Sequence, residues 1–236
     1  MNSVGEPHRL PEPLPRETEL TFEPYRFEIA AHRSLPIPEN IESPPILEVL
    51  HRRRSRRTFA PLTDEQLSSL LWFSAKTLAT TRESSGFPWQ HRPSPSGGGR
   101  HPIHILVLKP AVDPTSVYIY DTDAHALLTL GSAAVPDQFI DLLRDVLDPQ
   151  HGTVLWFAAD YHRTTTRYEH GESLVWRDAG ALLGTISMTA EALNLSCCAY
   201  GLTGDEWISR LLPPSRFLGV GGCVIGNSDV ALGRGA

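Results

Sequence analysis

The spacing of apolar and polar residues predicts two long helices. In LTDEQLSSLLWFSAKTL, residues 62–78, apolar residues recur every three or four positions, and Thr63 or Asp64 can cap the start of the helix. A second helix is predicted over RDAGALLGTISMTAEALNL, residues 177–195, with Asp178 as the capping residue at its start. This second segment is apolar on nearly every side and rich in small residues, so we expect it at the centre of the fold.

Shorter segments predict strands, because branched and aromatic residues dominate them and turn-forming residues bound them. Two of these strands form a hairpin with its turn near residues 121–124. Helices and hairpin-like strands follow one another without a regular strand–helix–strand repeat, which favours an α+β fold. The predicted strands lie within residues 103–110, 116–130, 152–160, 196–202 and 217–227, and further helices within 44–55, 136–147 and 204–212.

Two segments lack such periodicity. Residues 1–45 are rich in proline and predict an extended arm, either disordered or wrapped over a partner surface, in front of a domain that spans residues 46–236. Residues 80–100 are rich in Gly, Pro, Ser and Arg and predict a long loop. Long loops inside compact domains are often functional, so this loop is a candidate part of a site.

The composition narrows the classes of function. The 236 residues carry a formal net charge of −6, which argues against a nucleic-acid partner, and no apolar run is long enough for a membrane span. The N-terminus has charges and prolines where a signal peptide needs apolar residues, so we expect a cytoplasmic protein. Three cysteines, two of them adjacent in NLSCCAYG, favour neither a disulfide framework nor a metal site and predict small core residues.

An arginine cluster is the most unusual charged segment. RRRSRRTFAP, residues 52–61, places five arginines within six residues of an acidic chain. Arg53, Ser55 and Arg57 stand at alternate positions, so an extended segment would point all three to one side. Two guanidinium groups and a hydroxyl suit a phosphate. The alternative is a solvated helix end without a ligand.

A glycine-rich loop, RPSPSGGGRHP at residues 92–102, is the second candidate. Three consecutive glycines leave backbone N–H groups free to approach a flat or anionic ligand. The loop matches neither the phosphate loop of the nucleotide-binding ATPases nor the dinucleotide fingerprint, since both glycine spacings are absent. A flexible linker is the alternative, although Pro102 leads directly into a predicted strand.

Together these motifs resemble the nitroreductase superfamily, and more narrowly its SagB-type dehydrogenases, which include the azoline oxidases of peptide natural-product pathways. The resemblance extends over about residues 45–228, and the motifs occur in the family's order. They are RRSRRTF with the helix LTDEQLSSLLWFSA after it, PSGGGRHP entering a strand, YIYDTDAHALLTL as the Tyr-x-Tyr-Asp hairpin, and RDAGALLGTISMTAEALNLSCCAYG as the Asp-Ala-Gly helix with its strand.

The resemblance implies an α+β fold with a central antiparallel or mixed sheet flanked by helices, and an intertwined homodimer with FMN at its interface. Arg53, Ser55 and Arg57 would then contact the flavin edge, ribityl chain or phosphate. Gly201 would lie beside the isoalloxazine ring, and Arg234 matches loosely a basic residue placed on the phosphate near the C-terminus. The loop residues expected to line the flavin are Pro95, Ser96, Gly97 and Gly98.

The resemblance also indicates candidate residues for the reaction. The azoline oxidases, which this chain resembles, have a Lys-Tyr pair just before the Asp-Ala-Gly helix. Arg167 and Tyr168 occupy those positions here, so the tyrosine is retained and the lysine has become arginine. Tyr168 could transfer a proton. Arginine stays protonated, so Arg167 would orient an anion or favour the ionised form of Tyr168 rather than act as a base. His101 and His170 are candidates on composition only.

Three functions remain open at this point. The first is an FMN-dependent dehydrogenase or oxidase acting on a peptide or natural-product intermediate, which the Tyr-x-Tyr-Asp hairpin and the Tyr168 segment favour. The second is a nitroreductase or flavin reductase that takes hydride from NAD(P)H as co-substrate and passes it to a quinone or nitroaromatic. The third is an FMN-less scaffold in a biosynthetic complex. A biosynthetic partner enzyme is expected only by analogy with the family.

Overall fold

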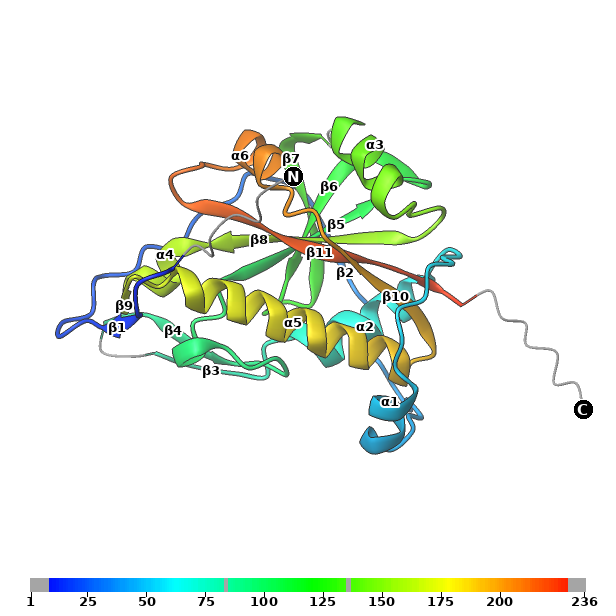
Figure 1. Cartoon of the computed structure of the whole chain (residues 1–236), viewed down its shortest axis with the longest axis horizontal. Coiled ribbons are helices and arrows are strands. Elements are labelled where there is room, and N and C mark those ends of the chain that lie inside the picture. Colours follow the sequence, from blue (N-terminus) through cyan, green and yellow to red (C-terminus); the bar gives the residue numbers. More distant parts are fainter. Residues whose placement is uncertain (1–8, 83–84, 135–136, 229–236) are drawn as a thin grey trace, which may run out of the picture.

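A seven-stranded antiparallel sheet forms the centre of the computed structural model, which describes residues 9–82, 85–134 and 137–228. Figure 1 shows this sheet crossing the molecule, with helices on both sides. The spatial order of the strands is β10 (Leu195–Tyr200), β11 (Phe217–Asn227), β8 (Thr153–Asp160), β5 (Ile103–Lys109), β6 (Asp113–Asp121), β7 (Ala126–Ala134) and β2 (Ile29–Ser34). Two short pairs lie outside it, namely β1 (Leu14–Pro15) with β9 (Tyr168–Glu169), and β3 (Ala79–Arg82) with β4 (Pro88–His91).

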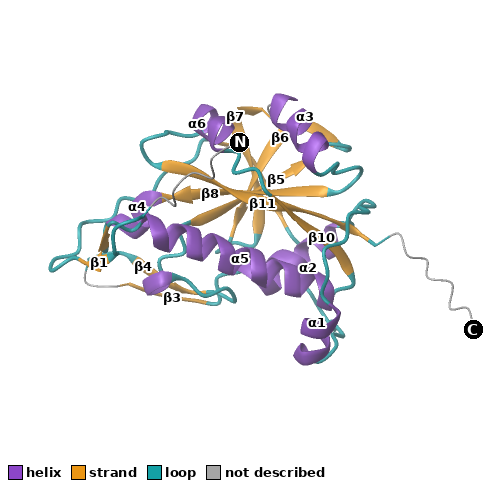
Figure 2. Cartoon of the chain, in the orientation of Figure 1, coloured by secondary structure: helices purple, strands orange, loops and turns teal. Residues whose placement is uncertain are grey.

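Helices cover the sheet on both faces, as Figure 2 shows. One face packs against α2 (Asp64–Ala75) and α5 (Glu172–Ala192), and the other against α3 (Asp137–Val146) and α6 (Asp205–Leu211). Strand β8 is buried along its whole length and sends alternate side chains into the two cores, such as Leu155 into the first and Trp156 into the second. The shorter helices are α1 (Ile46–Arg52), α4 (Tyr161–Thr165) and the 3₁₀ helix η1 (Gly97–Gly99).

The structure confirms the α+β class, with a central antiparallel sheet flanked by helices. The cap of α2 is Thr63 rather than Asp64. The Thr63 hydroxyl accepts a hydrogen bond from the Gln66 N–H, and the Gln66 side chain accepts one from the Thr63 N–H in return. The three cysteines are buried free thiols, as predicted for core residues. None of the described helices is both long and apolar enough to cross a membrane.

Two predictions about local structure were wrong. Residues 80–100 are not one structureless loop, because β4, η1 and all but the first residue of β3 lie within them. The predicted second helix, α5, begins at Glu172 and not near Asp178, with Gly171 as its N-cap. The earlier start lets Val175 join the buried row that continues through Ala179 and Leu182 at helical spacing.

The proline-rich N-terminal segment packs against the same chain where it is described. Strand β2 pairs with β7 at the end of the sheet, and the Leu20 N–H donates to the Thr166 carbonyl. The sequence analysis predicted no strand here. The side chains of β2 are mostly exposed, so this edge strand is held by backbone pairing and shows no hydrophobic alternation.

Candidate functional site

The arginine cluster is an extended segment fixed at both ends. Arg53 caps the C-terminus of α1, and its N–H donates to the Val49 carbonyl at 2.8 Å. Phe59 is buried in the core at the other end. Between them, the Arg56 N–H donates to the Cys197 carbonyl of the edge strand β10 at 3.1 Å. The segment therefore follows the free edge of the sheet in a defined conformation.

The side chains of this segment divide between core and solvent. The Arg56 guanidinium turns inward and donates to Glu191, from Nη1 to Oε2 at 2.7 Å and from Nη2 to Oε1 at 3.1 Å. Arg53, Ser55 and Arg57 are exposed. Since side chains alternate along an extended chain, the inward direction of Arg56 leaves Ser55 and Arg57 on the outer side.

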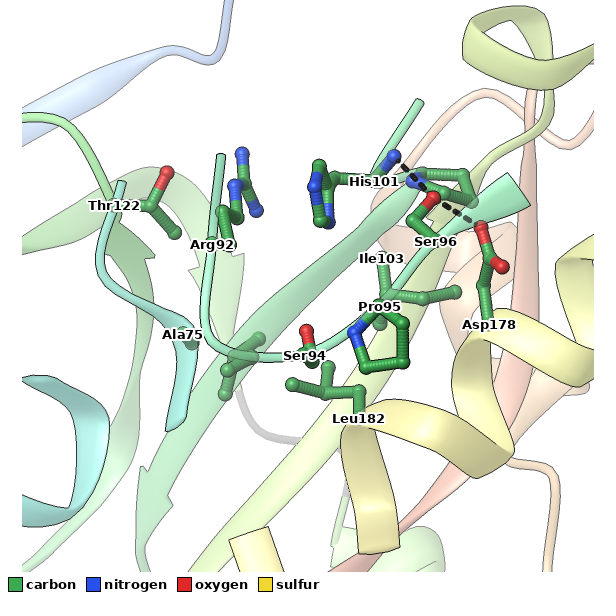
Figure 3. A pocket seen from close by; sticks show the side chains of 12 residues that line it. Ala75, Arg92, Ser94, Pro95, Ser96, His101, Ile103, Thr122, Asp178 and Leu182 are labelled. Atoms are coloured by element: carbon green, nitrogen blue, oxygen red, sulfur yellow. Dashed lines mark hydrogen bonds between the residues drawn. The ribbon is translucent and has the colours of Figure 1, made fainter. Parts of the chain in front are cut away.

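The glycine-rich loop is held by a carboxylate from the middle of α5. Ser96 Oγ donates to Asp178 Oδ2 at 2.5 Å (Figure 3). The Gly97 N–H donates to Asp178 Oδ1 at 2.9 Å. The prediction that Asp178 caps the helix was wrong, because α5 begins six residues before it and the side chain instead caps the loop. Burial raises the pKa of Asp178, although the hydrogen bonds from Ser96 and Gly97 oppose that shift.

Within this loop, glycine is required by backbone conformation. Gly98 and Gly99 both have φ of +63°, in the left-handed region that side chains rarely adopt. A Cβ on Gly98 would also lie 2.6 Å from the hydroxyl oxygen of Tyr168, and one on Gly99 would overlap the Trp89 ring. The structure therefore brings Tyr168 against the loop, a contact between residues far apart in sequence that no motif indicated.

Beside the loop is a cavity of about 20 Å³, room for one water molecule and far too small for a flavin. Figure 3 shows Arg92, Ser94, Pro95 and His101 at its wall. His101 is buried and donates from Nε2 to the Gln90 carbonyl at 2.9 Å. Burial, with the neighbouring Arg92, lowers the pKa of His101 to about 3. The imidazole is therefore neutral near pH 7 and is no proton donor there.

Two arginines next to the loop, the half-buried Arg92 and the buried Arg163, share one acceptor. The Gln90 side-chain oxygen accepts from Arg92 Nη2 at 2.5 Å and from Arg163 Nη2 at 3.3 Å. Arg163 Nε also donates to the Arg100 carbonyl at 2.8 Å. Burial lowers the pKa of Arg92 to about 9, and its repulsion by Arg163 adds to that shift. Sequence reasoning missed this network, since Arg163 lies more than sixty residues along the chain from the loop that it contacts.

Arg167 and Tyr168 lie where the N-terminal segment crosses the start of α5. Tyr168 is half-buried in β9, and the Arg167 carbonyl accepts from the Arg16 N–H at 2.9 Å. Within the described ranges, no hydrogen bond joins the Arg167 guanidinium to the Tyr168 hydroxyl. Exposed His170 stands two residues further along.

The remaining predicted residues are at separate places. Gly201 follows β10, is exposed and has open space where a side chain would be. Pro95 is exposed at the loop. Arg234 lies outside the described residues.

The arginine segment and the glycine-rich loop are not brought together within one chain. The first is anchored at Glu191 near the end of α5 and the second at Asp178 nearer its start. At 1.5 Å per residue, these two anchor points are about 20 Å apart along the helix. Figure 1 shows the same separation, with α1 near one end of α5 and the hairpin β3–β4 near the other.

Comparison with known proteins identifies the family. The sequence profile of the nitroreductase family matches residues 50–213, more than half of the chain. This chain belongs to the nitroreductase family. No curated protein sequence matches it significantly.

Solved structures agree on the fold. A protein of Ralstonia eutropha JMP134 assigned as a nitroreductase has a TM-score of 0.66 and 22% identity, covering 89% of this chain and 98% of its own. A second protein assigned as a nitroreductase, from Anabaena variabilis ATCC 29413, has a TM-score of 0.59 and 19% identity. The match covers 89% of this chain and 41% of that protein's chain. A chain of the E. coli microcin synthetase McbBCD complex with truncated pro-MccB17 bound has a TM-score of 0.55 and 16% identity. The match covers 84% of this chain and 79% of that chain. At these identities the likeness shows the nitroreductase fold.

Asp178→Ala is expected to lower the free energy of unfolding by about 2 kcal/mol, because the Ser96 hydroxyl and the Gly97 N–H both lose their acceptor. Hydrogen exchange at the Gly97 amide should accelerate together with this loss. Chemical denaturation and exchange measurements would check both effects, with Glu172→Gln, an exposed change on the same helix, as the control. Unchanged exchange at Gly97 would contradict the assignment of Asp178 as the anchor of the loop.

His101→Asn is expected to weaken the acid sensitivity of the fold. The pKa of His101 falls from 6.5 to about 3 on folding, so below pH 6.5 only the unfolded chain takes up the proton, and stability is lost as pH falls from 6.5 towards 3. The change in unfolding free energy between pH 7 and pH 5.5 should shrink by about 1 kcal/mol in the variant. An unchanged difference would mean that folding does not lower the pKa of His101. Asparagine suits the test because it tolerates the left-handed conformation found at this position.

Proposed function

We propose that this protein is an FMN-dependent oxidoreductase and that Arg53, Ser55 and Arg57 bind the cofactor phosphate. The observation that carries the proposal is the arginine segment itself. Two exposed guanidinium groups and a hydroxyl occupy a segment that backbone hydrogen bonds and the Arg56–Glu191 pair hold in place. Fixed donors of this kind suit a single phosphate, and they do so without making the whole chain basic.

The glycine-rich loop supplies the second part of the proposed site. Pro95, Ser96, Gly97 and Gly98 would line the flavin, where the absence of side chains at the glycines permits close approach. Because loop and arginine segment are far apart along α5, we propose that the loop of one copy meets the arginine segment of another in a homodimer. Gly201, which is exposed beside open space, would lie at the ring, and Arg234 would add a charge near the phosphate.

FMN, when bound, would supply the acceptor for a hydride. Tyr168 is then the candidate for proton transfer at its phenolic oxygen, because it lies against Gly98 of the same loop. Arg167 would orient an anionic group of the substrate, since a guanidinium does not release its proton. The low pKa of His101 and its hydrogen bond to the Gln90 carbonyl argue against this role for the imidazole.

The proposed substrate is a peptide or natural-product intermediate, handled alone or with a biosynthetic partner enzyme. The position of Tyr168 supports this choice, as does the shared fold of the microcin synthetase complex, which holds a truncated pro-MccB17. The alternative is NAD(P)H-dependent reduction of a quinone or nitroaromatic, which the family membership supports equally.

The cofactor is tested by colour. The purified protein should show the visible absorption of oxidised flavin, and Arg53→Ala and Arg57→Ala should each weaken FMN binding by about 10- to 100-fold, the loss expected for a charged hydrogen-bonding partner. Arg54→Ala also removes one positive charge from this segment. Because side chains alternate along an extended chain, Arg54 belongs to the opposite side from Arg53 and Arg57, so this variant should retain the flavin. A wild type that stays colourless after FMN is added would contradict the proposal.

The substrate class is tested by anaerobic bleaching of the flavin with two probes, a thiazoline-containing peptide and NADPH. Oxidation of thiazoline to thiazole releases a hydride and a proton, so the peptide should bleach the flavin and yield one thiazole per flavin. Tyr168→Phe should slow this bleaching by about 100-fold or more while flavin content stays constant, and Tyr161→Phe, outside the loop, should not. Bleaching by NADPH alone would favour the alternative function.

A further inference from the structure

We infer that Glu191 is a positioning residue for the phosphate site, an inference that rests on the proposed function. The side chain of Glu191 is 2% exposed. It is bound by two members of the arginine cluster, Arg56 in the two-pronged arrangement described above and Arg52, whose Nε lies 3.5 Å from Oε1. No resemblance or motif indicated this residue.

The place of Glu191 in α5 argues that it serves the arginine segment. It stands in the last turn of the helix, where the helix dipole disfavours a negative charge. A buried carboxylate is costly unless it is paired and hydrogen-bonded. Among the residues that the structure describes, the guanidinium groups of Arg56 and Arg52 are the partners that offset both costs, so the contact with Arg56 explains why an acid occupies this position.

The contact also determines what the neighbouring side chains can do. Arg56 lies between Ser55 and Arg57, so fixing its guanidinium below the segment keeps those two neighbours directed outward. Glu191 further compensates charge within a cluster of five arginines, which lowers the repulsion that would spread them apart. A site ordered before its ligand arrives binds that ligand more tightly, because less conformational entropy is lost on binding.

The test compares FMN with riboflavin, which lacks only the phosphate. Titrations of the full-length apoprotein, followed by flavin fluorescence, would give the ratio of the two dissociation constants. In Glu191→Gln we expect FMN affinity to fall by about tenfold with riboflavin affinity unchanged, and Glu191→Asp should recover part of the loss. Glu48→Gln is the matched control, because Glu48 also pairs with Arg52 but is exposed and does not touch Arg56.

Each outcome has one meaning. If the wild type does not prefer FMN to riboflavin, the proposed phosphate site fails, and the role of Glu191 fails with it. If the wild type prefers FMN and Glu191→Gln keeps that preference, or loses both affinities equally, the positioning role alone is overturned. If Glu191→Gln does not fold, the double variant Glu191→Gln/Arg56→Gln removes both charges of the pair, and it too should lose the preference for FMN. A double variant that keeps the preference would overturn the inference.

Discussion

The packing of α5 against the central sheet is the constraint on which the rest of the structure depends. Its buried row, which includes Val175 and Ile186, fixes the helix on one face of the sheet. Two buried carboxylates of this helix accept hydrogen bonds from other segments. Asp178 binds the glycine-rich loop, and Glu191 binds the arginine segment. The arginine segment is extended, and the loop holds only the three-residue 3₁₀ helix η1, so these contacts with α5 help to set the position of both. A shift of the helix would move the two halves of the proposed site together.

Much of the fold could be predicted from the sequence, because hydrophobic periodicity reports burial directly. The fully buried β8 and the capped α2 follow their patterns closely. Strand β2 gave no such signal, since its exposed side chains carry no alternation. The start of α5 was misplaced because Asp178 is a good capping residue type, and only the packed structure shows that its oxygens serve another segment.

The candidate site could be predicted only in part. Clusters local in sequence, such as the arginines and the glycines, stand out by composition. Their supports do not, because Glu191 lies 135 positions from Arg56 and Asp178 lies 81 from Gly97. The same is true of Tyr168, whose contact with Gly98 depends on the folding of β9 against the loop. A residue whose role depends on one partner distant in sequence is not indicated by hydrophobic periodicity or by a local motif.

The course of the arginine segment past β10 has a consequence for solubility. Strand β10 is at the end of the sheet, and an uncovered edge strand can add a strand from another molecule and so begin aggregation. Here the Arg56 N–H already donates to the Cys197 carbonyl, and exposed arginines lie on both sides of Arg56 in the sequence. Charged side chains at a sheet edge oppose strand addition. The segment proposed to hold the cofactor therefore also protects this edge of the sheet from polymerisation.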